Sequence, residues 1–207
     1  LPKENNMSAG FTGDLTLGGA YAYDINNTQQ LYKSRYNLLA VINELCLNVD
    51  IKDMENQDKN FIKKFLINDY DNSSSVNLIL MLNQDGFVIL TKDSEELAKG
   101  NYNEMHSNDF MHVEFSEPQQ KLINKKYEVN VMKPEDYYRT ISGMFQIDTS
   151  IRSPYQTLFN SGTILQINFT TNDIDEGIRI LNFSNNNFIN QNIEIETEQA
   201  RKALDYI

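Results

Sequence analysis

Residues 76 to 91 constrain the fold more than any other part of the sequence. Two apolar runs there flank the stretch Asn83, Gln84, Asp85, Gly86. The Asp-Gly pair is typical of a tight β-hairpin, because glycine accepts the positive φ that such turns need. The two runs are almost continuously apolar, so we expect both faces of these strands to be covered. The segment therefore predicts a hairpin in the middle of a buried sheet.

Two helices are predicted before this hairpin. Across residues 24 to 50, apolar side chains recur at the i, i+3, i+4 spacing of a long helix. The members of this pattern are Leu31, Leu38, Leu39, Ile42, Leu45 and Val49. A shorter apolar face, which includes Phe61 and Phe65, predicts an amphipathic helix over residues 58 to 68.

The second half of the chain predicts more strands. Tyr127, Val129 and Val131 alternate with polar residues as in a one-sided strand, and residues 144 to 147 are a shorter candidate. Residues 163 to 170 and 177 to 183 flank a turn-forming stretch, which predicts a second hairpin.

The predicted domain organisation is simple. Short helices are expected at residues 94 to 99 and, behind an N-cap threonine, at residues 197 to 207. Residues 1 to 23 hold four glycines and little periodicity, so we expect a flexible N-terminal segment. With no repeat and no linker beyond it, residues 24 to 207 are predicted to form one α+β domain with a central antiparallel sheet.

Charge and cysteine content exclude several classes of protein. The net charge of −11 and the pI near 4.6 exclude nucleic acid as the main ligand, because such binding draws on clustered Lys and Arg. The single cysteine, Cys46, excludes an intrachain disulfide, and its apolar neighbours predict a core thiol.

No apolar run approaches the roughly 20 residues of a membrane helix. The chain starts at Leu1, so a processed protein with an anchor elsewhere remains compatible.

Catalytic and metal-binding patterns are not recognisable in the sequence. The motifs GxSxG, HExxH, GxGxxG and the P-loop are absent, so we expect no enzyme and no cofactor. The two histidines, His106 and His112, lie near carboxylates, but their spacing matches no standard metal motif. We expect surface histidines there and no metal site.

A cluster of arginine and tyrosine is the strongest candidate for ligand binding. Glu135, Tyr138 and Arg139 lie in the stretch EDYYR, and Asp148 and Tyr155 follow. An arginine beside tyrosines can clamp a ligand carboxylate through a bidentate fork and an aromatic contact. The alternative is an aromatic surface ridge with a local ion pair.

Two stretches carry a resemblance to a known family. The sequence NLILMLNQDGFVILTKDSEELAKGNY, residues 77 to 102, is similar to the strand, D-G turn and strand of the Cache branch of PAS-like extracytoplasmic sensor domains. The sequence IRSPYQTLFNSGTILQINF, residues 151 to 169, resembles the later S-P-Y, turn and strand unit of that family. The resemblance implies a PAS/Cache-like antiparallel sheet with a long N-terminal helix across one face. A pocket for an amino acid or organic acid would lie on the other face.

The resemblance also implies a function and a site. It implies a ligand-sensing module outside the membrane, attached through flanking segments, whose long helix passes the signal on; a homodimer is compatible with this. The ligand contacts that we expect are Tyr102, Tyr138, Arg139, Asp148 and Tyr155. The alternative is a non-enzymatic surface or assembly protein that uses exposed aromatics and Asn-rich loops for protein or glycan contacts.

Overall fold

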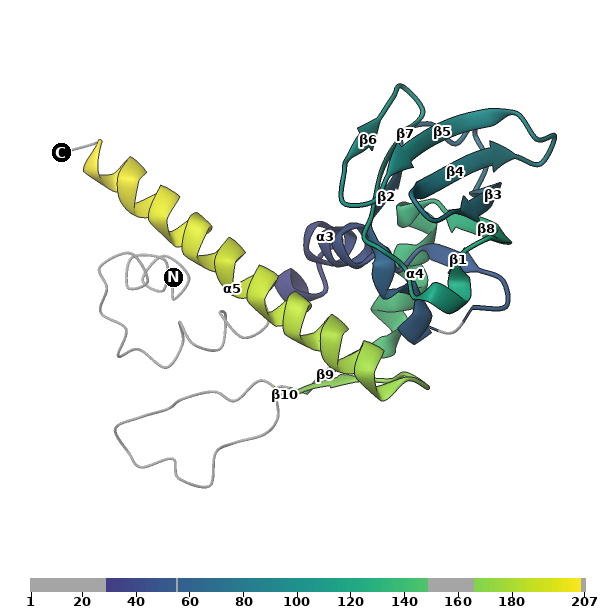
Figure 1. Cartoon of the computed structure of the whole chain (residues 1–207). Helices are drawn as coiled ribbons and strands as arrows, with labels where there is room; N and C mark the ends of the chain where they lie inside the picture. Colours follow the sequence, from purple (N-terminus) through teal and green to yellow (C-terminus); the bar gives the residue numbers. More distant parts are fainter. Residues whose placement is uncertain (1–28, 55, 149–165, 206–207) are drawn as a thin grey trace, which may run out of the picture.

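The computed structural model describes residues 29–54, 56–148 and 166–205. These residues form an α+β fold with three antiparallel sheets, and a long C-terminal helix extends away from the sheets (Figure 1). The predicted flexible segment at residues 1 to 23 lies outside the described residues.

The predicted central hairpin is confirmed. Strands β3 (Ser75–Leu82) and β4 (Gly86–Thr91) pair with Leu80 opposite Ile89 and Leu82 opposite Phe87. They lie inside a five-stranded sheet with the order β1-β8-β3-β4-β5, whose other strands are β1 (Val49–Ile51), β5 (Glu96–Asn101) and β8 (Lys125–Met132). The predicted strand at residues 127 to 131 is therefore also confirmed.

The two faces of the central hairpin differ in burial. Leu78, Leu80 and Leu82 on one face are almost fully buried, whereas Ile79 and Met81 on the other face are only half-buried. The prediction that both faces are fully covered is therefore wrong for the second face. The near-continuous apolar run reflects one buried face and one partly open face that still carries apolar side chains.

A three-stranded sheet covers the buried face. Its strands are β2 (Ile62–Ile67), β7 (Met111–Phe115) and β6 (His106–Ser107), in the order β2-β7-β6. The ring of Phe115 meets that of Phe87 edge-on, with their centroids 4.6 Å apart, and it also contacts Phe61 and Phe65. The first core of the protein lies between these two sheets.

Two predicted helices are strands in the structure. Residues 58 to 68 form the end of a 3-10 turn, η1 (Asn56–Phe61), and then β2. Phe61 and Phe65 fit a helical spacing, but Phe65 and Ile67 are buried while Lys64 and Leu66 are more exposed, which is the alternation of a strand. The helix predicted at residues 94 to 99 is also wrong, because residues 96 to 101 form strand β5. In this strand Ala98 faces the core. A second short 3-10 turn is η2 (Gln120–Leu122).

A second core is built mainly from helices. It joins α3 (Arg35–Leu45), α4 (Pro134–Met144) and α5 (Ile174–Leu204) to the two-stranded sheet of β9 (Phe145–Asp148) and β10 (Gln166–Phe169). Its fully or almost fully buried members are Tyr32, Leu38, Val41, Ile42, Ile141, Phe145 and Ile180. The strand predicted at residues 144 to 147 is confirmed as β9.

The predicted long helix over residues 24 to 50 is interrupted in the structure: residues 29 to 32 are helical, the helix breaks at Lys33 and Ser34, and α3 follows, while residues 24 to 28 lie outside the described residues. Helix α3 begins after Ser34, whose hydroxyl oxygen accepts a hydrogen bond from the backbone N–H of Asn37 at 3.2 Å. It ends before Cys46, which adopts the left-handed conformation with φ of 51°. Helix α3 packs against α4, α5 and β2.

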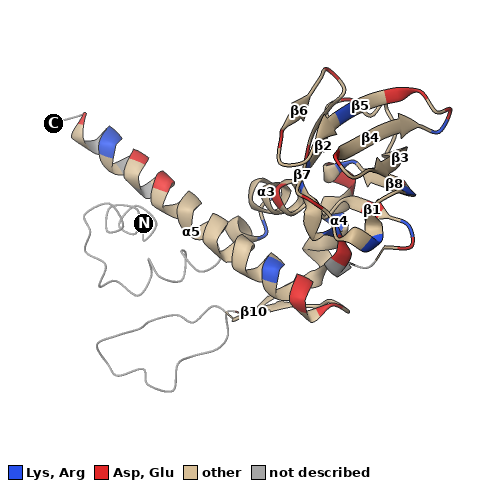
Figure 2. Ribbon diagram, viewed as in Figure 1, with Lys and Arg blue, Asp and Glu red and all other residues tan. Residues whose placement is uncertain are grey.

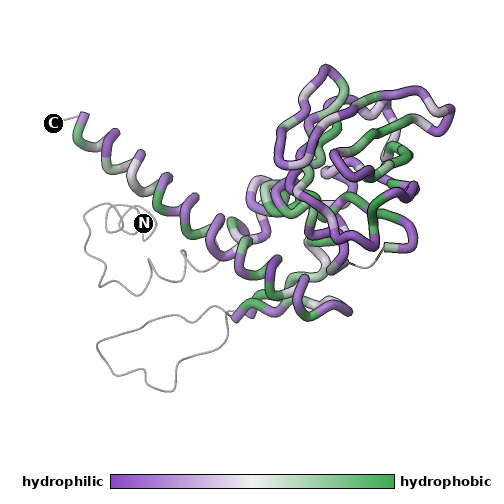
Figure 3. Tube along the Cα trace, viewed as in Figure 1, coloured by the Kyte–Doolittle hydropathy of each residue, from purple (hydrophilic) through white to green (hydrophobic). Residues whose placement is uncertain are grey.

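The longest helix is α5, which contradicts the predicted second hairpin. Residues 177 to 183 are helical, because Asp173 caps the helix start by accepting a hydrogen bond from the N–H of Glu176 at 3.1 Å. Residues 197 to 204 of the predicted C-terminal helix are the far part of this same helix, so Thr197 lies inside α5 and is not an N-cap, and residues 206 and 207 lie outside the described residues. Figure 2 shows charged residues at both ends of α5 and none in its middle, and Figure 3 shows apolar residues along its whole length.

None of the helices in the described residues is both long enough and apolar enough to cross a membrane.

Candidate functional site

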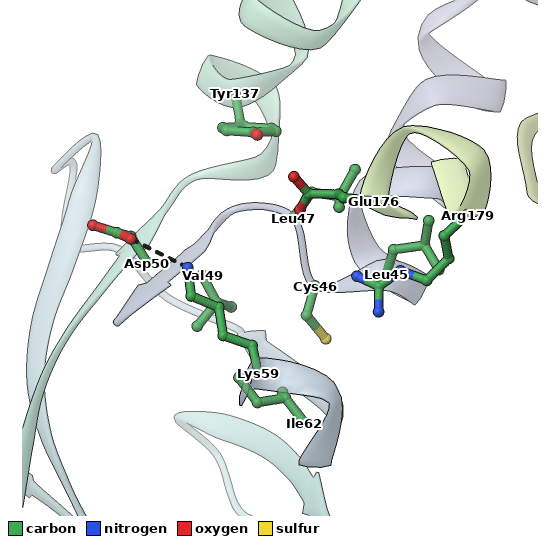
Figure 4. A pocket seen from close by; sticks show the side chains of 10 residues that line it. All are labelled: Leu45, Cys46, Leu47, Val49, Asp50, Lys59, Ile62, Tyr137, Glu176 and Arg179. Atoms are coloured by element: carbon green, nitrogen blue, oxygen red, sulfur yellow. Dashed lines mark hydrogen bonds and ion pairs between the residues drawn. The ribbon is translucent and has the colours of Figure 1, made fainter. Parts of the chain in front are cut away.

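A cavity lies where the two cores meet. The left-handed residue Cys46 turns the chain from α3 into β1, so that its own side chain enters the first core while Leu45 and Leu47 pack against the second. Helix α4 and the first two turns of α5 complete the walls (Figure 4). We call this space the junction cavity.

The junction cavity is small and chemically mixed. Its volume is about 270 Å³, just below the roughly 300 to 1,000 Å³ of pockets that take drug-sized ligands. An apolar floor of leucine, valine and isoleucine is combined with four charged side chains and one phenol. The lining residues are Leu45, Cys46, Leu47, Val49, Asp50, Lys59, Ile62, Tyr137, Glu176 and Arg179.

Both signs of charge come from each side of the cavity. On one side Lys59 pairs with Asp50, with 3.3 Å between Nζ and Oδ1, and the Lys59 side chain is only 19% exposed. On the other side α5 contributes Glu176 and Arg179, three residues apart and therefore neighbours on the helix surface. The guanidinium of Arg179 donates a hydrogen bond to Oδ1 of Asn60 at 3.1 Å, which ties α5 to η1.

The ionisable groups of the cavity influence one another. Burial raises the pKa of the Glu176 carboxyl above its usual value, and the nearby charge of Asp173 adds to this, while Arg179 and Lys59 oppose it. Burial also raises the pKa of Tyr137, and the charges of Glu176 and Asp50 raise it further. The cavity thus places a partly desolvated carboxylate close to two cations and a neutral phenol.

Cys46 contributes packing to the cavity and no nucleophile. The residue is 6% exposed, and burial raises the pKa of its thiol to about 11. A thiol with such a pKa is almost entirely protonated at neutral pH, and the thiolate is the reactive form. The core thiol expected from the sequence is confirmed.

These groups suit recognition of a small molecule that carries both charges. Lys59 and Arg179 can hold an anion, Glu176 can hold an ammonium, and the apolar floor accepts a short side chain.

Within the part of the chain that the structure describes, no group of three or more His, Cys, Asp and Glu residues could hold a metal ion.

The sequence-predicted contacts lie elsewhere. The hydroxyl of Tyr102 donates to the backbone oxygen of Asn83 at 2.7 Å, at the turn of the central hairpin. The hydroxyl of Tyr138 donates to the backbone oxygen of Lys33 at 3.2 Å, and its ring packs on the second core. These two tyrosines therefore pack on different cores.

The remaining predicted contacts are also outside the junction cavity. Arg139 is exposed on α4, and Asp148 ends β9 opposite Gln166. Tyr155 lies outside the described residues. None of the four described residues lines the junction cavity, and their role as ligand contacts stays a prediction.

Sequence reasoning missed most of the cavity residues. Tyr137 lies inside the EDYYR stretch, one residue from a predicted contact. The sequence pattern places Glu176 in a predicted turn and Arg179 in a predicted strand, which hides their common helix face. The signal that could have found them is the pair Asp173 and Glu176, which has the spacing of a helix capping box.

Comparison with known proteins gives no relative: no protein-family model matches the chain, and no curated protein matches its sequence.

Proposed function

We propose that this protein is a non-enzymatic ligand-sensing domain that binds a small zwitterion of the amino-acid class in the junction cavity. The observation that supports the proposal best is the presence of both signs of charge in a cavity of about 270 Å³. A PAS/Cache-like fold, a location outside the membrane and attachment through flanking segments belong to the same proposal. The five-stranded antiparallel sheet supports the proposed PAS/Cache-like fold, because Cache domains have such a sheet.

The charges define how the ligand would bind. The ligand carboxylate would pair with Arg179 and Lys59, and its ammonium would pair with Glu176. Burial makes the charged form of Glu176 costly, and an ammonium would offset that cost by supplying an opposite charge in the same desolvated place. A ligand with only one of the two charged groups would interact with only one of the two walls.

Helix α5 is the element that would carry the signal. Its first two turns supply Glu176 and Arg179 to the cavity wall, and the same helix continues to Leu204. At 1.5 Å per residue, 31 residues span about 46 Å. A ligand that draws Glu176 and Arg179 inward would shift a rigid helix whose far end lies well outside the sheets.

Matched small molecules test the proposal. L-Alanine carries both charges, propionate lacks the ammonium, and ethylamine lacks the carboxylate. We expect thermal stabilisation and calorimetric binding with alanine or a similar small amino acid, and at least tenfold weaker binding with its two one-charge analogues. If the folded protein binds none of a panel of small amino acids, the proposal is wrong.

Substitutions link the binding to the cavity. Glu176→Gln should reduce the affinity about tenfold, the equivalent of about 1.4 kcal/mol for one charged partner. Asp175→Asn is the matched control, because Asp175 is exposed on the same turn and does not line the cavity. Equal loss in both variants would place the binding site elsewhere.

The alternative function is that of a non-enzymatic assembly protein. The exposed isoleucines of α5 favour it, because a large exposed apolar surface often marks a contact with another protein. A stable complex in the absence of any small-molecule binding would support this alternative.

A further inference from the structure

Tyr137 differs from the other tyrosines in the described ranges that are buried or half-buried. The others each donate a hydrogen bond from the hydroxyl to another residue, at distances of 2.7 to 3.3 Å. They are Tyr32, Tyr70, Tyr102, Tyr127 and Tyr138. Tyr36 is 73% exposed, so its hydroxyl is open to water. The hydroxyl of half-buried Tyr137 makes no hydrogen bond with any residue in those ranges.

The side chain of Tyr137 lines the junction cavity (Figure 4). Its ring packs against the second core, which fixes the phenol at the cavity wall. Burial raises the pKa of this phenol, and the charges of Glu176 and Asp50 raise it further, so the group is neutral at pH 7 and keeps its proton. Because a buried tyrosine hydroxyl usually has a partner, an unpaired one at a cavity wall indicates a place for a polar group of a ligand.

The two charged ends of a zwitterionic ligand already have charged partners in this cavity. Lys59 and Arg179 suit its carboxylate, and Glu176 suits its ammonium. Tyr137 is the neutral polar side chain of the same wall, so it suits a neutral polar group. A hydroxyl is the smallest such group, and it can either donate to the phenol or accept from it.

We propose that the preferred ligand is a small amino acid with a hydroxyl on its side chain, as in serine, and that this hydroxyl binds to Tyr137. The inference rests on the proposed function, because it concerns the same cavity. An apolar ligand of similar size, such as alanine, would enclose the phenol without giving it a partner. Sites that bind a ligand hydroxyl through a hydrogen bond discriminate against the analogue that lacks it.

Serine and alanine are the matched ligands for the test, because they differ by a single oxygen atom. Calorimetry of the wild-type chain should show L-serine binding about fivefold tighter than L-alanine, as expected for one hydrogen bond. Tyr137→Phe removes only the hydroxyl and should bring the two affinities within about twofold of each other. A general structural effect would weaken both ligands equally and leave this ratio unchanged. Tyr36→Phe is the control outside the cavity and should keep the preference for serine.

The stability of the same variant gives a readout that needs no ligand. Tyr137→Phe should have the Tm of the wild type, because its hydroxyl has no partner in the protein to lose. Tyr127→Phe should have a lower Tm, because it loses the hydrogen bond to the backbone oxygen of Leu122 at 3.1 Å. If Tyr137→Phe lowers the Tm as much as Tyr127→Phe does, the hydroxyl of Tyr137 has a structural partner and the proposal is overturned.

The binding results separate this proposal from the proposed function. Equal affinity of the wild type for serine and alanine would overturn the role of the ligand hydroxyl. So would a Tyr137→Phe variant that keeps the preference, or one that weakens both ligands equally, which would assign the phenol to a charged end of the ligand. In each of these cases an amino acid still binds and Glu176→Gln still weakens it, so the proposed function stands. If no small amino acid binds to the folded protein, both are wrong.

Discussion

Gly86 occupies a position where two strands leave no room for a side chain. A Cβ atom on Gly86 would collide with the backbone oxygen of Gly100 in β5. The φ of Gly86 is outside the left-handed region, so the hairpin does not need this glycine for its conformation. The Asp-Gly pair predicted the hairpin correctly, but the glycine is required by the close approach of β4 and β5.

Gly86→Ala should therefore destabilise the protein. The backbone of β5 must move to accept the methyl group, and such overpacking costs about 1 to 3 kcal/mol. Urea unfolding measures the change. Gly143→Ala in α4 is the control, because a Cβ there meets nothing within 4 Å, and alanine should stabilise the helix by up to about 1 kcal/mol. Equal destabilisation by both variants would contradict the argument.

Cys46 should resist alkylation in the folded protein. Burial raises its pKa to about 11, so at pH 8 only about 0.1% of the thiol is ionised, and its sulfur is enclosed as well. We expect iodoacetamide to label the native chain at least a hundredfold more slowly than the urea-unfolded chain. Labelling of the native chain at the unfolded rate would mean that the turn after α3 opens readily.

At the scale of elements, a polar network fixes α5 on α3. Asn37 is fully buried, donates to the backbone oxygen of Tyr32 at 2.7 Å, and accepts from Asn187 at 2.7 Å. The hydroxyl of Tyr32 donates to Asn185 at 2.7 Å. Without Asn37, the amide of Asn187 would lose its acceptor, whereas Asn185 would keep its bond from Tyr32.

Asn37→Ala should weaken the docking of α5. It leaves the Asn187 amide and the Tyr32 carbonyl without these partners, and each buried unsatisfied group costs about 1 to 3 kcal/mol. Chemical unfolding should show a loss of about 2 to 3 kcal/mol, and hydrogen exchange should increase first in α5. Asn182→Ala, at an exposed position of α5, is the control and should change stability by less than about 0.5 kcal/mol.

The sequence predicted an element correctly where its apolar residues fitted only the period of a strand or only the period of a helix. The hairpin of β3 and β4 and the alternation in β8 belong to strands alone. In residues 177 to 183 the apolar positions fit both periods, and the helix is decided by the cap at Asp173 and by packing against α3. Phe61 at the end of η1 and Phe65 in β2 share a helical spacing by chance, and their packing against Phe115 of the distant strand β7 decides the outcome.

At the scale of the whole molecule, the junction cavity depends on contacts that no local pattern reports. Asp50, Lys59, Tyr137 and Glu176 come from four separate elements, and they meet only because two cores share the turn at Cys46. Local spacing cannot predict such a meeting, which explains why four of the five predicted ligand residues lie between residues 138 and 155, whereas the cavity residues range from 45 to 179.

The pH dependence of stability should reveal the cavity. The pKa of Glu176 is raised in the folded state, so between its ordinary value of 4.5 and the raised value the folded chain binds more protons than the unfolded chain. The contribution of Glu176 to the free energy of unfolding therefore falls as pH rises through this window, and its ionised form remains costly at pH 7. Glu176→Gln removes that cost.

We expect Glu176→Gln to be more stable than the wild type at pH 7 in the absence of ligand. The difference should narrow as pH falls toward 4, where the wild-type carboxyl is protonated and resembles the amide. Urea unfolding at pH 7 and pH 4 measures the difference in the free energy of unfolding between the variant and the wild type. Asp175→Asn is the exposed control, and its free energy of unfolding should change little. A less stable Glu176→Gln at pH 7 would mean that the charges of Arg179 and Lys59 outweigh the burial of the carboxylate.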